Sequence, residues 1–301
     1  MTSKSDLFGL HFAALLLGGT ALFSKLIPLP ALDITALRGV LATLLLALLL
    51  LTTRRSFRLE SRSHYLMMGV GGLLFAFHWL TYFYAMQVSS VAVGVIALFT
   101  FPVITALMEP LMDLKRPDKH SLAMSLVVLA GVGLIGLEGS IAGNVVLGLT
   151  LGVLSAILYS ARNILQRRKL MGVSGPVTMF YQCVITALVF LPFLGPTVAE
   201  LSLNTWLLIL LLSSVFTAVP HSLIAHGLRS INATSASFIL ALQVFYATLL
   251  AALVLSEVPG PATIAGGLLI VLSSIYVTRQ ARRASRQVIS SPVSLPRTAE
   301  K

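Results

Sequence analysis

The chain has 301 residues, of which 57% are hydrophobic and only 10% are charged, and its mean hydropathy is +0.94. A soluble domain carries about 25% charged residues, so this composition excludes an ordinary soluble protein and predicts a chain that folds in a lipid bilayer. The net charge of +11 does not indicate nucleic-acid binding, because the basic residues stand in short clusters between apolar runs.

Ten apolar runs are long enough to cross a hydrocarbon core of about 30 Å at about 1.5 Å per residue. The runs are continuous and do not alternate with polar residues, which predicts helices and not strands. We expect the first run to be an uncleaved span, because it is long enough to cross and no small-residue cleavage site follows it. In chain order the expected spans are 8–27, 33–52, 66–87, 91–112, 120–138, 146–166, 176–195, 204–228, 231–254 and 261–279.

Lysine and arginine gather in every second connection, after the second, fourth, sixth, eighth and tenth runs, and the alternate connections contain neither. Positive residues stay on the cytoplasmic side of a membrane. This pattern predicts a multi-pass protein of the cell's inner membrane with both termini in the cytoplasm. Residues 285–301 are polar and include Pro292 and Pro296, which predicts a disordered cytoplasmic tail.

The chain repeats itself with an offset of about 144 residues, as between Ala97 and Ala241. The matching segments end in an acid, Asp113 in the first and Glu257 in the second. Each unit would hold five helices, and because five is odd the second must be inserted upside down. Inverted repeats around a site at the bilayer midplane are typical of transporters. The expected units are 1–140 and 141–284, followed by the tail.

Short patterns in several runs add to this layout. They are Leu37-Arg38-Gly39, Phe101-Pro102-Val103, Thr234-Ser235-Ala236-Ser237, Ser256-Glu257 and Gly266-Gly267. With the ten-run layout, they make the chain resemble EamA-like members of the drug/metabolite transporter superfamily from about residue 8 to 280. The resemblance implies a secondary transporter of small metabolites such as amino acids that works by alternating access, with export favoured by the family's many exporters. The chain departs from the family at Tyr246, where proline is frequent.

Polar and aromatic side chains inside the runs are the candidates for binding the substrate. A polar side chain at membrane depth is costly, so it should face a cavity or another helix. The alternative for each residue is a hydrogen bond that only holds helices together. The candidates are His78, Trp79, Tyr82, Tyr159, Asn163, His221, Gln243 and Tyr246.

Glu109 and two prolines are candidates for coupling or gating. A protonatable carboxylate at Glu109 could couple transport to protons; the alternative is an acid paired with Lys115 or Arg116. Pro102 and Pro220 can kink their helices and serve as hinges.

Two arginines also fall within the runs. Arg38 could bind a substrate carboxylate or take part in gating; the alternative is an interfacial side chain that pairs with Asp33. Arg162 is expected near the cytoplasmic end of its span.

The sequence contains no HExxH, P-loop or GxSxG pattern and no carboxylate cluster at metal-ligand spacing. We therefore expect no catalytic residues, metal or cofactor, and a protein that is not an enzyme. The expected partners are a small-molecule substrate and lipid, and the sequence leaves open whether copies of the chain associate. The alternatives are an intramembrane enzyme that uses His78 or His221, a lipid-handling protein, and a structural or sensory membrane partner.

Overall fold

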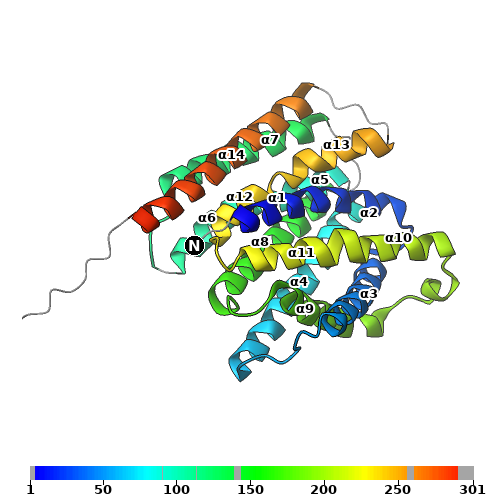
Figure 1. Cartoon of the computed structure of the whole chain (residues 1–301). Coiled ribbons are helices and arrows are strands. Elements are labelled where there is room, and N and C mark those ends of the chain that lie inside the picture. Colours follow the sequence, from blue (N-terminus) through cyan, green and yellow to red (C-terminus); the bar gives the residue numbers. More distant parts are fainter. Residues whose placement is uncertain (1–3, 90, 113, 139–143, 256–260, 291–301) are drawn as a thin grey trace, which may run out of the picture.

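The computed structural model describes residues 4–89, 91–112, 114–138, 144–255 and 261–290, and each regular element in these ranges is a helix (Figure 1). Asp113 and Glu257, the acids that end the two repeats, lie outside the described residues. The α-helices are α1 Lys4–Gly18, α2 Phe23–Leu26, α3 Ala31–Thr52, α4 Arg62–Val88, α5 Val91–Leu98, α6 Phe101–Leu111, α7 Lys119–Glu138, α8 Val145–Lys169, α9 Gly175–Phe190, α10 Leu203–Ser213, α11 Val219–Gly227, α12 Ala233–Leu240, α13 Gln243–Leu255 and α14 Pro261–Ser290.

Six stretches of the described chain are long and apolar enough to cross a membrane. They correspond to the first, second, third, sixth, seventh and eighth expected spans, and shorter apolar helices stand in the other four. Large apolar side chains also cover the outer surface, such as Phe8 at 72% exposure and Leu203 at 76%. The chain is therefore an all-helical, multi-pass membrane protein whose outer faces suit lipid.

The fourth and ninth expected spans are each interrupted near their middle. In the first half, α5 ends at Leu98 and α6 begins at Phe101. Pro102 explains this break, since it has no N–H to donate to the carbonyl of Leu98 and its ring crowds that carbonyl. In the second half, α12 ends at Leu240 and α13 begins at Gln243 without any proline. There Leu242 donates to the Ile239 carbonyl at 3.2 Å, a tighter three-residue turn.

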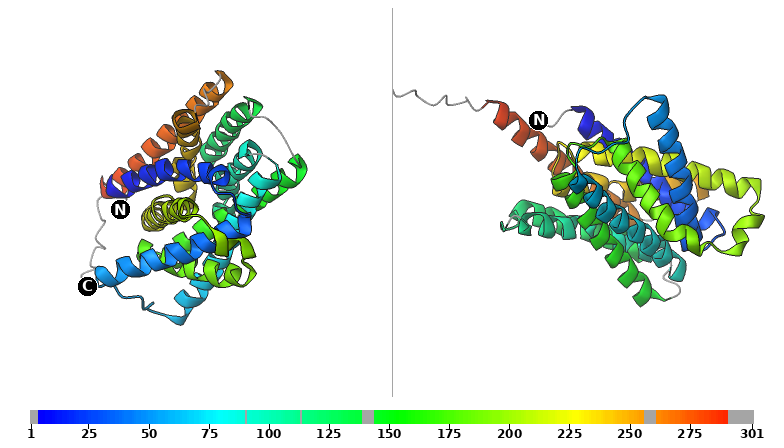
Figure 2. Two further views of the ribbon diagram at one scale, coloured as in Figure 1. Left: turned by 90° about the vertical axis from the view of Figure 1, so that its right-hand side faces the viewer. Right: turned by 90° about the horizontal axis from the view of Figure 1, so that it is seen from below.

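The contacts between helices follow the repeat. Helix α4 packs on α8 as α1 packs on α11, and α6 packs on α8 as α1 packs on α13. Two further pairs, α3 with α9 and α7 with α14, join each element to its own counterpart. Figures 1 and 2 show α7 and α14 lying side by side along one edge. Exchanging the halves therefore preserves the packing, as an approximate twofold relation requires.

The two described ends of the chain lie at the same end of the molecule (Figures 1 and 2). Helix α14 continues to Ser290, so residues 285–290 of the expected disordered tail are helical. The rest of that tail lies outside the described residues.

Candidate functional site

A small cavity of about 30 Å³ lies among α1, α3, α4, α8, α11 and the ends of α5 and α13. We call it the central cavity. Residues of both halves line it: Leu17, Thr20, Arg38, His78, Trp79, Tyr82, Leu98, Tyr159, His221 and Gln243. Such a volume holds about one water molecule, so the site has no room for a larger molecule in this structure.

Both interrupted helices reach the central cavity, because Leu98 ends α5 and Gln243 begins α13.

Six of the eight candidate substrate-binding residues line the cavity, and they are His78, Trp79, Tyr82, Tyr159, His221 and Gln243. The other two do not. Asn163 accepts a hydrogen bond from Arg162 instead. Tyr246 lies where α13 approaches α1 so closely that a Cβ on Gly18 would stand 2.7 Å from the Tyr246 Cβ.

His78 is held in one orientation by α8. The Ser155 hydroxyl donates to the His78 carbonyl at 2.9 Å, so its oxygen is free to accept from the His78 Nδ1–H at 2.7 Å. The imidazole stacks on the Tyr159 ring, with centroids 4.6 Å apart and planes 21° apart. This pair of hydrogen bonds assigns the proton to Nδ1 and leaves Nε2 as an acceptor.

Arg38 is 1% exposed and lines the central cavity. Its guanidinium carbon lies 3.9 Å from the centre of the Trp79 ring, and its Nε donates to the Thr217 hydroxyl at 2.5 Å. Within the described residues, no carboxylate contacts it. The expectation that Arg38 pairs with Asp33 is wrong, because the Asp33 carboxylate accepts from the backbone N–H of Gly195 at 2.9 Å.

Arg162 is a second arginine in the interior, with 0% exposure. Its Nε and Nη2 donate to the Gln182 side-chain oxygen at 3.0 and 2.6 Å, and its Nη1 donates to the Asn163 side-chain oxygen at 2.9 Å. The sequence predicted its position along the span, near the cytoplasmic end, but not its burial among these side chains. The spacing of Ser155, Tyr159 and Arg162 by one helical turn each puts them on one face of α8, which was a signal for burial.

Two polar atoms beside the central cavity have no hydrogen-bond partner in the described part of the chain, the Tyr159 hydroxyl and the His221 Nδ1. Buried polar groups in folded proteins are almost always hydrogen-bonded. These two atoms therefore offer hydrogen bonds to a molecule that enters the cavity. His221 also corresponds to His78 in the repeat, since nearly the same offset separates them.

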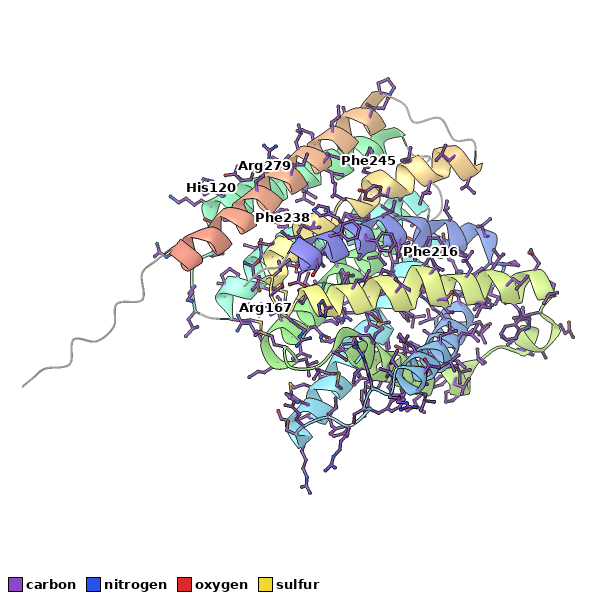
Figure 3. All side chains as sticks on the ribbon, viewed as in Figure 1. His120, Arg167, Phe216, Phe238, Phe245 and Arg279 are labelled. Carbon is purple, nitrogen blue, oxygen red and sulfur yellow. The ribbon has the colours of Figure 1, made fainter. Side chains whose placement is uncertain are left out.

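A larger opening of about 550 Å³, which we call the vestibule, lies between α6, α8 and the start of α12. Its lining residues are Ala106, Glu109, Pro110, Lys115, Asp118, Ser121, Arg167, Arg168, Met171, Asn232, Thr234 and Ser235. None of them lines the central cavity. Arg167, labelled in Figure 3, projects from the end of α8.

Glu109 joins the two halves across the vestibule. Its carboxylate accepts from the backbone N–H groups of Ala233 and Thr234 at 2.8 and 2.6 Å, and from the Thr234 hydroxyl at 2.6 Å. These are the first residues of α12, where unpaired N–H groups and the helix dipole favour an anion. The alternative expected for Glu109 was an ion pair with Lys115 or Arg116. Among the described residues, its carboxylate binds the start of α12 instead.

The two candidate hinge prolines are buried. Pro102 stands in the first turn of α6, directly after the break. Pro220 stands in the first turn of α11, after a π-helical turn over Ser214–Ala218. Among the described residues, no group of three His, Cys, Asp or Glu side chains could hold a metal ion.

The sequence profile of the EamA-like transporter family matches residues 5–137 and again residues 146–279. Among curated proteins, no sequence matches the chain. Twenty-nine chains of solved structures match it. One of them, a crystal structure described only as that of a protein, has a TM-score of 0.76 at 21% identity and covers 94% of this chain and 99% of its own. At this identity the likeness shows the fold alone.

Proposed function

The chain belongs to the EamA-like transporter family and is a membrane transporter of small molecules, and from this premise we propose that it works as a secondary transporter by alternating access. The cargo is a small polar metabolite. The observation that carries the proposal is a small cavity between two repeats, lined by buried polar side chains from both. In transporters of repeated architecture the substrate site lies between the repeats and is built on interrupted helices.

The chemistry of the central cavity fits a metabolite that is partly planar. Trp79, Tyr82 and Tyr159 supply aromatic walls, and Gln243 supplies an amide that can donate and accept. The cavity in its closed form holds about one water molecule, so it must widen before a metabolite can enter. Amino acids and related metabolites, the cargo expected from the sequence, are of the right size for such a widened site.

In this proposal, the contact between Glu109 and the start of α12 controls the path from the vestibule to the central cavity. Glu109 belongs to the first repeat and binds the start of α12 in the second. Releasing these hydrogen bonds would separate α6 from α12 and open the vestibule toward the central cavity. Protonation of Glu109 is one way to release them, because a neutral carboxyl is a weaker acceptor.

We further propose that the vestibule faces the cytoplasm of a cell whose inner membrane holds the protein, with export as the direction. Lys115, Arg167 and Arg168 line the vestibule, and basic residues concentrate on the cytoplasmic side of membrane proteins. Both described chain ends would then be cytoplasmic.

The test is flux through proteoliposomes that contain only this protein. A mixture of amino acids, organic acids, nucleosides and vitamins is loaded, and the solutes that cross are identified by mass spectrometry. We expect selective flux, lowered about tenfold or more by Tyr82→Ala, which corresponds to about 1.4 kcal/mol. Tyr276→Ala, on the outer surface of α14, is the matched control and should leave the flux unchanged.

Absence of flux for each solute, with and without a pH gradient, would contradict the proposal. A chemically altered product inside the vesicles, abolished by His78→Ala, would favour the intramembrane enzyme instead.

A further inference from the structure

The central cavity contains a cation for which the described residues provide no counter-ion. We infer that Arg38 binds the acidic group of the cargo, so that the transported metabolite is a small organic acid that binds as a net anion through its carboxylate. This inference rests on the proposed transport function and narrows the cargo to one chemical class.

The hydrogen-bonding capacity of Arg38 is largely unused. A guanidinium has five N–H donors. Among the described residues, an acceptor is present for one of them, the Nε–H, which donates to the Thr217 hydroxyl. The four N–H groups on Nη1 and Nη2 belong to a side chain that is 1% exposed and lines the cavity. Paired N–H groups in a fixed plane match the two oxygens of a carboxylate.

Trp79 and Thr217 fix the direction in which these donors point. The Trp79 ring covers one face of the guanidinium at 3.9 Å, and the ring of Phe83 lies 5.5 Å from the same carbon atom. The Thr217 hydroxyl holds the Nε edge. The edge that carries Nη1 and Nη2 is therefore held in place before the cargo arrives, which reduces the entropy lost on binding.

The lining of the cavity distinguishes an anion from a zwitterion. None of the described residues that line the cavity is a carboxylate, so the ammonium group of an amino acid would find no opposite charge among them. Arg162, which donates to the side-chain oxygens of Gln182 and Asn163, adds a second cation nearby and is not among the residues that line the cavity. An ammonium group would be repelled by both arginines in a medium of low dielectric constant. An acid whose nitrogen is absent or acylated escapes this repulsion.

The remaining groups of the cavity suit the rest of such a molecule. The unpartnered Tyr159 hydroxyl and His221 Nδ1 can hydrogen-bond to a second polar group of the acid. The vestibule adds a weak preference of the same sign, because its three basic side chains, Lys115, Arg167 and Arg168, outnumber its two carboxylates, Glu109 and Asp118.

The test uses matched compounds and two readouts on the full-length protein. N-acetylphenylalanine, phenylalanine and N-acetylphenylalaninamide share one aromatic body and carry an anion, a zwitterion and no charge. A panel of further small carboxylic acids is paired in the same way with the neutral amides. Binding is measured as the rise in melting temperature of the detergent-solubilised protein, and transport as flux into proteoliposomes. Three variants are compared with the unmodified chain: Arg38→Gln, Thr217→Val and Arg58→Gln.

We expect acids to stabilise the unmodified protein and to be transported at least tenfold better than the paired amides, with the N-acetylated acid ahead of the amino acid. Arg38→Gln should abolish this preference. Thr217→Val, which retains the cation but no longer holds its Nε edge, should reduce this preference, and Arg58→Gln, at an exposed position, should keep it. The preference of the unmodified protein decides the inference even if Arg38→Gln fails to fold.

Equal stabilisation by acids and amides, or an acid preference that survives in a folded Arg38→Gln protein, would overturn the inference. Flux without acid preference would overturn it and leave the transport function standing. Selective binding of acids without flux of any solute would support the inference and contradict the transport function.

Discussion

Glu109 shows how one side chain can couple two halves of a membrane protein. A single carboxylate satisfies two backbone N–H groups and one hydroxyl at the start of α12. Charged acceptors make hydrogen bonds worth about 1.5–3 kcal/mol each when buried. At a helix N-terminus the helix dipole adds about 0.3–1 kcal/mol. The contact is therefore strong enough to bias a conformational equilibrium and weak enough to be broken.

We predict that Glu109→Gln shifts the protein toward the form in which the vestibule is open. The amide nitrogen of Gln cannot accept from the N–H groups of α12, so about 1–3 kcal/mol is lost, or about 5- to 150-fold in population. The shift is measured as faster modification by a membrane-impermeant maleimide of Ala106→Cys, a position that lines the vestibule and is 1% exposed in this structure. Glu60→Gln, at an exposed position, is the control. An unchanged modification rate would show that Glu109 does not hold the vestibule closed.

Interrupted helices differ between the repeats although they occupy corresponding places. The first break follows from Pro102, whereas the second is a tight turn in a segment that keeps its backbone donors. The Tyr246 N–H donates to the Leu242 carbonyl at 3.1 Å, a bond that a proline at this position would remove. The two breaks should therefore differ in stiffness, and the first should respond strongly to one substitution.

Pro102→Ala should join α5 and α6 into a straighter helix. The new N–H can bond to the Leu98 carbonyl, and removing a proline from a helix relieves about 3 kcal/mol. We expect slower amide hydrogen exchange over residues 99–103 and lower flux, because the break borders the central cavity. Pro176→Ala is the control, since a proline in the first turn of α9 disturbs no hydrogen bond. Unchanged exchange over 99–103 would mean that Pro102 does not cause the break.

In the proposed mechanism, relative movement of the two halves changes access to one cavity. The pairs α3 with α9 and α7 with α14 join equivalent elements, and they relate the halves symmetrically. In such an arrangement, separation at the vestibule can accompany closure at the opposite end. Small shifts are amplified in this way because packed interfaces have discrete arrangements.

A chemical link across the vestibule should therefore stop transport. We predict that a short thiol-reactive crosslinker between Glu109→Cys and Thr234→Cys lowers flux at least tenfold, and that a cleavable crosslinker restores it on reduction. Each single variant treated in the same way is the control. The native Cys183 is 0% exposed, so it contributes little background. Full flux through the linked protein would exclude opening at this place.

The sequence predicted the fold better than the site. Long apolar runs and alternating basic connections suffice for an all-helical, multi-pass chain, because the bilayer imposes a simple rule on length and polarity. The burial of Arg162 was not predicted, because its contacts with Phe75 and Gln182 come from other helices of the fold. The partner of Arg38, Thr217, is 179 residues away in the sequence. No local pattern in the sequence predicts such a contact.

The charge of Arg38, which has no counter-ion among the described residues, also bears on the energy source of transport. If a monoanion crosses while Arg38 remains within the protein, each cycle moves one negative charge across the membrane. The membrane potential, negative inside, then contributes about 2.3 kcal/mol per 100 mV to outward movement of the anion. Export of an acid would need no coupling ion, whereas uptake of the same acid would have to overcome the potential. Net flux that follows a potassium diffusion potential in vesicles would reveal this charge movement directly.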